Sequence, residues 1–161
     1  MNELKIETII RIYPTINDLD DAAKELMQKA QAVLPEAYAP YSHFNVGAAL
    51  RLNNGKVVTG TNQENASFPL GLCAERIAVA AAASLYPNAD LTMIAITIKN
   101  FNKPTTTPVS PCGTCRQVLL EKENQAQKPI RILLKSEGPE IYEVARVSDL
   151  LPLSFAGDII A

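Results

Sequence analysis

Apolar and polar residues in the first third of the chain follow two different periods. Between residues 19 and 34 the apolar side chains recur every three or four positions, which predicts an amphipathic helix. Asn17 is its expected N-cap, because the aspartates that follow would stabilise the positive end of the helix dipole. Pro35 should end the helix, since proline lacks the backbone N–H that a helix interior needs.

Short apolar segments at residues 44–52 and 57–61 flank the polar sequence Asn53-Asn54-Gly55-Lys56. Asparagine and glycine tolerate a positive φ, so this arrangement predicts a β-hairpin. Further along, the pattern predicts an alanine-rich helix at 74–85, a buried strand at 91–99, a helix at 112–124, strands at 130–135 and 141–144, and a helical turn near 148–151. Such a mixture of strands and helices indicates one central sheet covered by helices.

The composition is that of a globular protein. The chain has 161 residues, of which 47% are apolar and 20% charged, and its net charge is −2. Because there is no basic excess, we expect no nucleic-acid partner. The longest mainly apolar stretch, residues 77–85, is far shorter than the roughly 20 residues of a membrane span, and the acidic N-terminus is unlike a secretory signal. We therefore expect a cytoplasmic protein without a membrane partner, with residues 1–16 as an unassigned N-terminal extension and residues 17–161 as a single domain.

Three cysteines carry the main chemical signal. Cys112 and Cys115 form a C-x-x-C motif at an expected helix start, where the helix dipole lowers thiol pKa values, and Cys73 begins another helix. Three thiolates provide three corners of a zinc tetrahedron and leave the fourth position for water, as in catalytic zinc sites. A redox pair at Cys112 and Cys115 is an alternative interpretation. The only histidine, His43, is a candidate fourth ligand, but its position beside a strand start favours a solvated or hydrogen-bonding role.

Two charged residues next to Cys73 complete the candidate site. Glu75 does not share a helix face with Cys73, but it can reach over the open zinc position and act as a general base and then a general acid. Arg76 can donate hydrogen bonds to the thiolates, and this would draw charge away from a zinc centre with a net charge of about −1. Without the three cysteines, Glu75 would be interpreted as a helix-dipole glutamate and Arg76 as a surface ion-pair residue.

The motifs Cys73-Ala74-Glu75-Arg76 and Pro111-Cys112-Gly113-Thr114-Cys115 resemble the double signature of the cytidine deaminase family, in its three-cysteine, homotetrameric branch. Segments at 37–50, 62–66 and 150–155 are also similar to that family. The resemblance implies an α/β fold, a three-layer α/β/α sandwich with a mixed sheet of about five strands. It implies one Zn²⁺ per chain, held by the three cysteines, with Glu75 moving protons. The implied reaction is hydrolytic deamination of cytidine and 2′-deoxycytidine to uridine and 2′-deoxyuridine with release of ammonia, in pyrimidine salvage.

The resemblance also assigns residues to nucleoside binding, namely Phe44, Asn62, Glu64, Ala74, Ser110 and Phe155. Asn62 and Glu64 would bind the ribose hydroxyls, and Phe44 would pack against the pyrimidine. Ala74 and Ser110 would contact the base through their backbone groups. Each has a simpler structural interpretation as well, such as a strand-core position for Phe44 and a solvated loop position for Glu64.

Phe155 would reach the active site of a neighbouring subunit in a homotetramer, or else make a local core contact. Three other functions are alternatives at this point: a deaminase of aminopyrimidine antibiotics of the blasticidin type, a polynucleotide-editing deaminase, and a redox or structural zinc module. The acidic chain and the N-x-E motif at residues 62–64 disfavour the polynucleotide enzyme. The chain departs from the family pattern at residues 1–16, at Pro35, and in longer segments at 100–107 and 125–129.

Overall fold

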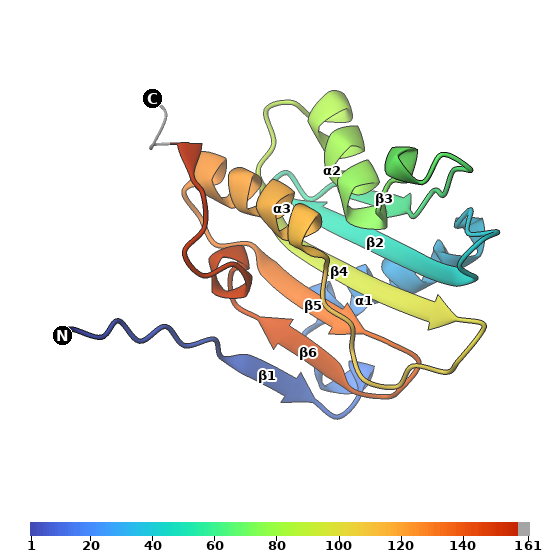
Figure 1. The fold of residues 1–161 in the computed structure, drawn as a ribbon, viewed down its shortest axis with the longest axis horizontal. Helices are drawn as coiled ribbons and strands as arrows, with labels where there is room; N and C mark the ends of the chain where they lie inside the picture. The colour runs from blue at the N-terminus through green and yellow to red at the C-terminus, as the bar shows by residue number, and fades with distance from the viewer. Residues whose placement is uncertain (158–161) are drawn as a thin grey trace.

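A computed structural model describes residues 1–157, so residues 158–161 of the expected domain lie outside the described part. Six strands form one mixed sheet in the order β1-β6-β5-β4-β2-β3 (Figure 1). The strands and α-helices are β1 (Ile10–Tyr13), α1 (Asp21–Ala32), β2 (Phe44–Leu52), β3 (Val57–Thr61), α2 (Ala74–Leu85), β4 (Leu91–Asn100), α3 (Gly113–Ala126), β5 (Arg131–Lys135) and β6 (Ile141–Val144). Short 3₁₀ helices occur at η1 (Ile16–Asp18), η2 (Leu34–Glu36), η3 (Phe68–Leu70) and η4 (Val147–Leu150).

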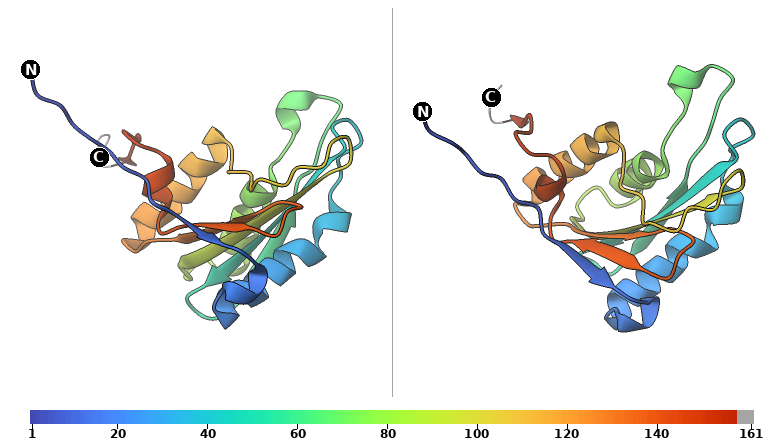
Figure 2. Two further views of the ribbon diagram at one scale, coloured as in Figure 1. Left: turned by 90° about the horizontal axis from the view of Figure 1, so that it is seen from below. Right: turned by 60° about the horizontal axis from the view of Figure 1, so that its bottom comes forward.

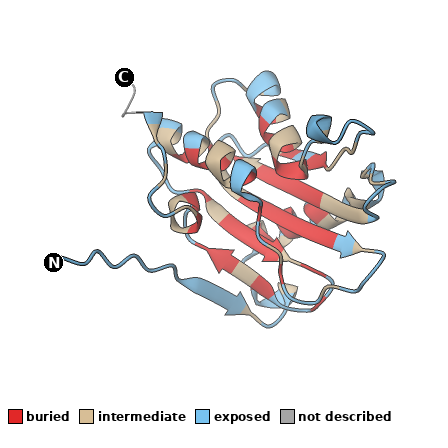
Figure 3. Cartoon of the chain, in the orientation of Figure 1, coloured by how far each residue is buried: buried red, intermediate tan, exposed pale blue. Residues whose placement is uncertain are grey.

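Helix α1 covers one face of the sheet, and α2 and α3 cover the other (Figure 2). Successive residues of a strand point to opposite faces. Accordingly Leu50 and Ile94 belong to the apolar cluster under α2 and α3, while Ala49 and Ala95 belong to the cluster under α1. Burial is concentrated in the middle of the sheet and on the helix faces that meet it (Figure 3). The expected three-layer sandwich is therefore confirmed.

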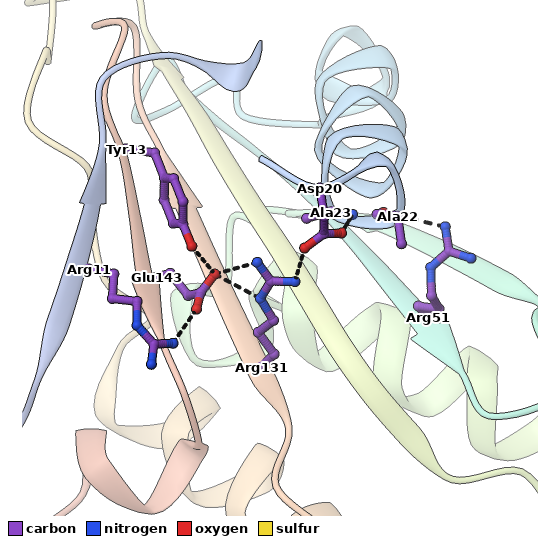
Figure 4. Close-up of polar contacts among 8 residues, drawn as sticks. All are labelled: Arg11, Tyr13, Asp20, Ala22, Ala23, Arg51, Arg131 and Glu143. Atoms are coloured by element: carbon purple, nitrogen blue, oxygen red, sulfur yellow. Dashed lines mark hydrogen bonds and ion pairs between the residues drawn. The ribbon is translucent and has the colours of Figure 1, made fainter. Parts of the chain in front are cut away.

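The sheet has six strands rather than about five. The additional strand is β1, which comes from the segment left unassigned by the hydrophobic pattern and pairs antiparallel with β6. It is anchored by polar contacts, because Arg11 and Tyr13 both donate hydrogen bonds to the buried Glu143 (Figure 4). The isoleucines of this segment stay exposed, so the strand is not one that contributes to the hydrophobic core.

The start of α1 also differs from the prediction. Asp20, not Asn17, is the N-cap, and its carboxylate accepts a hydrogen bond from the Ala23 N–H at 2.9 Å. Asn17 instead lies in η1, which is capped by Thr15. The helix ends at Ala32, before the proline expected to stop it. Within residues 1–157, the structure has no helix of the length and apolar character needed to cross a membrane.

The topology places the starts of α2 and α3 at the same end of the sheet, beyond the C-terminal ends of β3 and β4. Both β3 and β4 run antiparallel to β2, so their C-terminal ends lie on the same side. Gly60 in β3 permits close packing there, because a Cβ at this position would lie 2.6 Å from the Ala74 carbonyl oxygen. The first turn of α2 can therefore approach the sheet and meet the first turn of α3.

A three-cysteine cluster beside a deep cavity

Cys73 and Cys112 are the N-cap residues of α2 and α3. N-cap side chains usually accept a hydrogen bond from the first helical turn. Neither cysteine makes such a bond, so both Sγ atoms are free to bind something else. The Cys112 Sγ lies 3.9 Å from the Cys73 Sγ and 3.5 Å from the Cys115 Sγ, and all three sulfurs lie within 4.8 Å of one another.

This geometry fits zinc. A tetrahedral zinc with Zn–S bonds of about 2.3 Å separates its sulfurs by about 3.8 Å, which the observed distances bracket. Within the cluster Cys115 is buried and Cys112 is exposed. The fourth coordination position of a zinc ion can therefore face the cavity. His43 is not part of the cluster; its side chain is exposed and its backbone is left-handed, with φ of 53°. The zinc-binding chemistry of the chain therefore lies in its three cysteines.

Arg76 supplies the positive charge that faces these thiols. One guanidinium nitrogen donates to the Gly71 carbonyl at 2.9 Å, whereas the buried Nε has no hydrogen-bond partner among the described residues. The neighbouring Cys115 thiol, together with Cys112 and the Arg76 charge, lowers the pKa of Cys73 to about 5. The same contact with Cys73 raises the pKa of Cys115. The cluster thus holds thiolate charge beside a cation, as a thiolate-rich metal centre requires.

Glu75 is a buried carboxyl group in the first turn of α2. It is only 5% exposed and lines the cavity together with Cys73 and Cys112. Its burial raises the pKa of the carboxyl group above the ordinary value for glutamate. A carboxylate with a raised pKa accepts a proton more readily than an exposed one, which suits a general base.

The cavity beside the cluster has a volume of about 460 Å³. The residues predicted from the sequence that line it are Phe44, Asn62, Glu64, Cys73, Glu75, Ser110 and Cys112. Its remaining wall is mainly apolar, with Val46, Ile96 and Ile98 contributed by the sheet. An apolar slot with a few convergent polar groups is typical of a small-molecule site.

Asn62 and Glu64 hold the backbone of the cavity wall. The Asn62 amide accepts from the Val46 N–H at 2.7 Å and donates to the Phe44 carbonyl at 2.9 Å. The Glu64 carboxylate accepts from two backbone N–H groups, those of residues 41 and 42, at 2.9 and 3.2 Å. Hydrogen bonding to Ser42 also lowers the pKa of Glu64, so this side chain is anionic at neutral pH. Each side chain retains a further donor or acceptor position for a ligand.

Two of the residues predicted to bind the nucleoside lie elsewhere. Ala74 is fully buried in the first turn of α2 and does not line the cavity. Phe155 is 58% exposed, and its carbonyl accepts a hydrogen bond from Gln117 on α3, away from the cavity of its own chain.

Three supporting residues were not assigned roles from the sequence. Arg116 donates to the Pro111 carbonyl at 2.9 Å and to the Leu150 carbonyl at 2.8 Å, and so ties the start of α3 to η4. In the sequence, its position directly after the C-x-x-C motif was the feature that could have indicated a role for Arg116 in the site. Asn102 donates to the Ser42 carbonyl at 2.8 Å, so the longer loop after β4 braces the cavity wall. Glu137 accepts from two backbone N–H groups of that same loop.

The chain is similar in sequence and fold to known proteins. Residues 20–127 match the family model described as the cytidine and deoxycytidylate deaminase zinc-binding region. A protein of Halalkalibacterium halodurans named cytidine deaminase is 39% identical over 133 residues, which cover 83% of this chain and 93% of that protein. A crystal structure of cytidine deaminase from Burkholderia pseudomallei matches with a TM-score of 0.69 at 39% identity, over 81% of this chain and 97% of the other. The corresponding structure from Mycobacterium tuberculosis gives 0.66 at 35% identity, over 85% and 99%.

Proposed function

This chain belongs to the cytidine and deoxycytidylate deaminase family, and we propose that it hydrolyses cytidine and 2′-deoxycytidine to uridine and 2′-deoxyuridine with release of ammonia, in pyrimidine salvage. The observation that carries this proposal is a cluster of three cysteine thiols, two of which line the same cavity as the buried carboxyl group of Glu75. The names of the relatives at 39% identity support the same activity.

Cys73, Cys112 and Cys115 would hold zinc, which supplies a Lewis acid that lowers the pKa of a water molecule toward about 7. Glu75 accepts a proton from the water that attacks C4 of the pyrimidine and delivers a proton to ring nitrogen N3. It then helps to protonate the departing amino group, so that C4 gains oxygen and loses ammonia. Burial keeps the Glu75 pKa high enough for both directions of transfer.

The remaining site residues position the nucleoside. Phe44 packs against the pyrimidine from β2, and the backbone of Ser110 contacts the base from the loop before α3. Asn62 and Glu64 bind ribose hydroxyls through the hydrogen-bonding positions that the backbone contacts leave open. The Ala74 backbone contributes at the first turn of α2, where helical N–H groups lack partners within the helix.

We further propose that residues 17–161 form the catalytic domain of a cytoplasmic homotetramer in which Phe155 completes a neighbour's site. Large apolar side chains stay exposed at, or close in the sequence to, residues that line the cavity, which supports an assembled form. These are Tyr41, Phe68, Leu70, Leu72 and Phe101, with exposed fractions of 44–76%.

The deciding experiment follows the fall in ultraviolet absorbance when cytidine is added to the protein, with zinc quantified in the same sample. We expect Glu75→Gln to keep its zinc and fold but to lose at least 10²–10⁴-fold in turnover, the usual worth of general acid–base catalysis. Glu140→Gln, an exposed position outside the cavity, is the matched control and should retain full activity. The proposal is wrong if zinc-loaded wild-type protein leaves cytidine unchanged or releases ammonia only from a blasticidin-type antibiotic.

A further inference from the structure

The N-terminal 13 residues leave an unusual amount of apolar surface uncovered. Apart from the terminal Met1, their exposed large apolar side chains are Leu4, Ile6, Ile9, Ile10 and Ile12, with exposed fractions of 47–79%. The family model begins at residue 20, so this segment lies outside the part of the chain that the family shares. Strand β1 is the edge of the sheet, paired only with β6 on one side (Figure 1).

The two faces of this segment differ in character. Arg11 and Tyr13 point toward Glu143, on the α1 side of the sheet (Figure 4). By the two-residue period of an extended chain, Ile10 and Ile12 lie on the opposite face, and residues 4, 6 and 8 continue it. Thr8 donates to the Asp149 carbonyl at 2.6 Å, and the residues before it run on as an extended arm (Figure 2). Exposed apolar edge strands are prone to pair with another strand.

We propose that residues 5–13 pair antiparallel with the same residues of a second copy, about a two-fold axis at Ile9. A symmetric pairing must keep the apolar face continuous, which requires residues of like parity to lie opposite one another. Centring on Ile9 achieves this and places Ile6 opposite Ile12 of the other copy. The two sheets would then join edge to edge.

Charge favours this register over its neighbours. Moving the axis to residue 10 would place Glu7 opposite Tyr13 and Arg11 opposite Ile9, so both attractions described next would be lost. With the axis at Ile9, Glu7 lies opposite Arg11 of the other copy, and the pair occurs twice. Moving the axis to residue 8 would place Lys5 opposite Arg11, and moving it to residue 7 would place Glu7 opposite itself. Both alternatives set like charges against each other, which is destabilising. Arg11 is 62% exposed and uses one nitrogen for Glu143, so its remaining donors are available.

The test is the rate of disulfide formation between zinc-loaded full-length chains that carry Ile9→Cys. Directly opposite residues in an antiparallel pair have Cβ atoms about 4.5–5.5 Å apart, close to the span of a disulfide. We expect rapid formation of a linked dimer for Ile9→Cys. Ile6→Cys, whose proposed neighbour is position 12 of the other copy, should link no faster than wild-type protein with its three native cysteines. All altered positions are exposed, so the fold is unaffected.

A charge variant tests the register. Adding Glu7→Lys to Ile9→Cys turns two attractions into two repulsions and should slow linkage about tenfold. Adding Glu3→Lys makes the same change in net charge beyond the paired strands and should leave the rate unchanged. The proposal is overturned if Ile9→Cys links no faster than Ile6→Cys. It is equally overturned if the two lysine variants slow linkage alike, because net charge rather than pairing would then control the encounter.

Discussion

Glu143 is a buried carboxylate whose charge depends on neighbouring arginines. It is 3% exposed and accepts hydrogen bonds from Arg131 Nε at 2.7 Å, Arg11 at 2.8 Å and Tyr13 at 3.1 Å (Figure 4). Arg131 also contacts Asp20, the N-cap of α1, at 2.5 Å, so it links the sheet to the helix that covers it. Burial acts to raise the pKa of Glu143, but Arg131 and then Arg11 outweigh it and hold the pKa below its usual range.

Replacing Arg131 with methionine should therefore destabilise the fold. Loss of one partner from a buried ion pair costs about 3–5 kcal/mol. The Arg131 side chain is 24% exposed and Arg11 remains in place, so the lower end of that range, about 3 kcal/mol, is expected. For a domain of this size the thermal midpoint should fall by about 6–12 °C. Arg11→Met, with a side chain that is 62% exposed, is the matched control and should cost about 1 kcal/mol or less.

The difference in stability between wild type and Arg131→Met should become smaller as the pH falls. A lowered pKa in the folded state means that ionised Glu143 stabilises the fold above its ordinary pKa of 4.5, and that this stabilisation is lost as the pH falls below it. The gap between wild type and Arg131→Met should therefore be full at pH 7 and should narrow near pH 4. Adding Glu143→Leu to Arg131→Met should recover part of the loss, since the buried charge is then removed and the charges that lose a partner, Arg11 and Asp20, are exposed.

Urea denaturation at both pH values measures these differences. Zinc release contributes to the free energy of unfolding of both proteins. Comparing zinc-loaded wild type with zinc-loaded Arg131→Met at each pH removes that contribution from the difference. Equal stability of wild type and Arg131→Met at pH 7 would refute the reasoning. So would a gap that stays constant down to pH 4, because the interaction would then not involve an ionised Glu143.

Four further outcomes are expected. Cys73→Ala should lose most of its zinc by metal analysis, because two thiolates cannot replace three; full occupancy would remove this residue from the ligand set. Glu64→Gln should weaken cytidine binding by about 1.5–3 kcal/mol while leaving the free base cytosine little affected, since the contact proposed for its carboxylate is with the sugar; equal losses would contradict a sugar contact. Asn102→Ala should raise KM several-fold with unchanged zinc and kcat, because it braces the Ser42 carbonyl, and an unchanged KM would deny that role. Phe155→Ala should raise KM about tenfold, by analogy with base stacking. Leu153→Ala, which changes another exposed apolar side chain of the same segment, is the control and should leave KM unchanged. A fully active monomer by light scattering would refute a shared site.

Sequence patterns that involve only near neighbours were sufficient to predict much of the secondary structure. The hairpin of β2 and β3 and the bounds of α2 follow from periodicity and turn residues, because these depend on neighbours within a few positions. The placement of Cys73 and Cys112 at helix starts could be predicted from the sequence for the same reason. Their chemistry was then constrained by residue type, since three thiols beside a carboxyl group suit few functions.

Contacts between distant residues required the tertiary structure. Strand β1 pairs with β6, and its Arg11 meets Glu143, 132 positions away; no local pattern encodes that partner. The N-cap of α1 is Asp20 rather than Asn17, and Asp20 also reaches Arg131 on β5, a contact that no local pattern reveals. The amide of Asn62 and the carboxylate of Glu64 are oriented by backbone groups of the cavity wall. Sequence determined which chemical groups and local elements are present, whereas the strand order decided which of them meet, because chain segments become neighbours only when the sheet assembles.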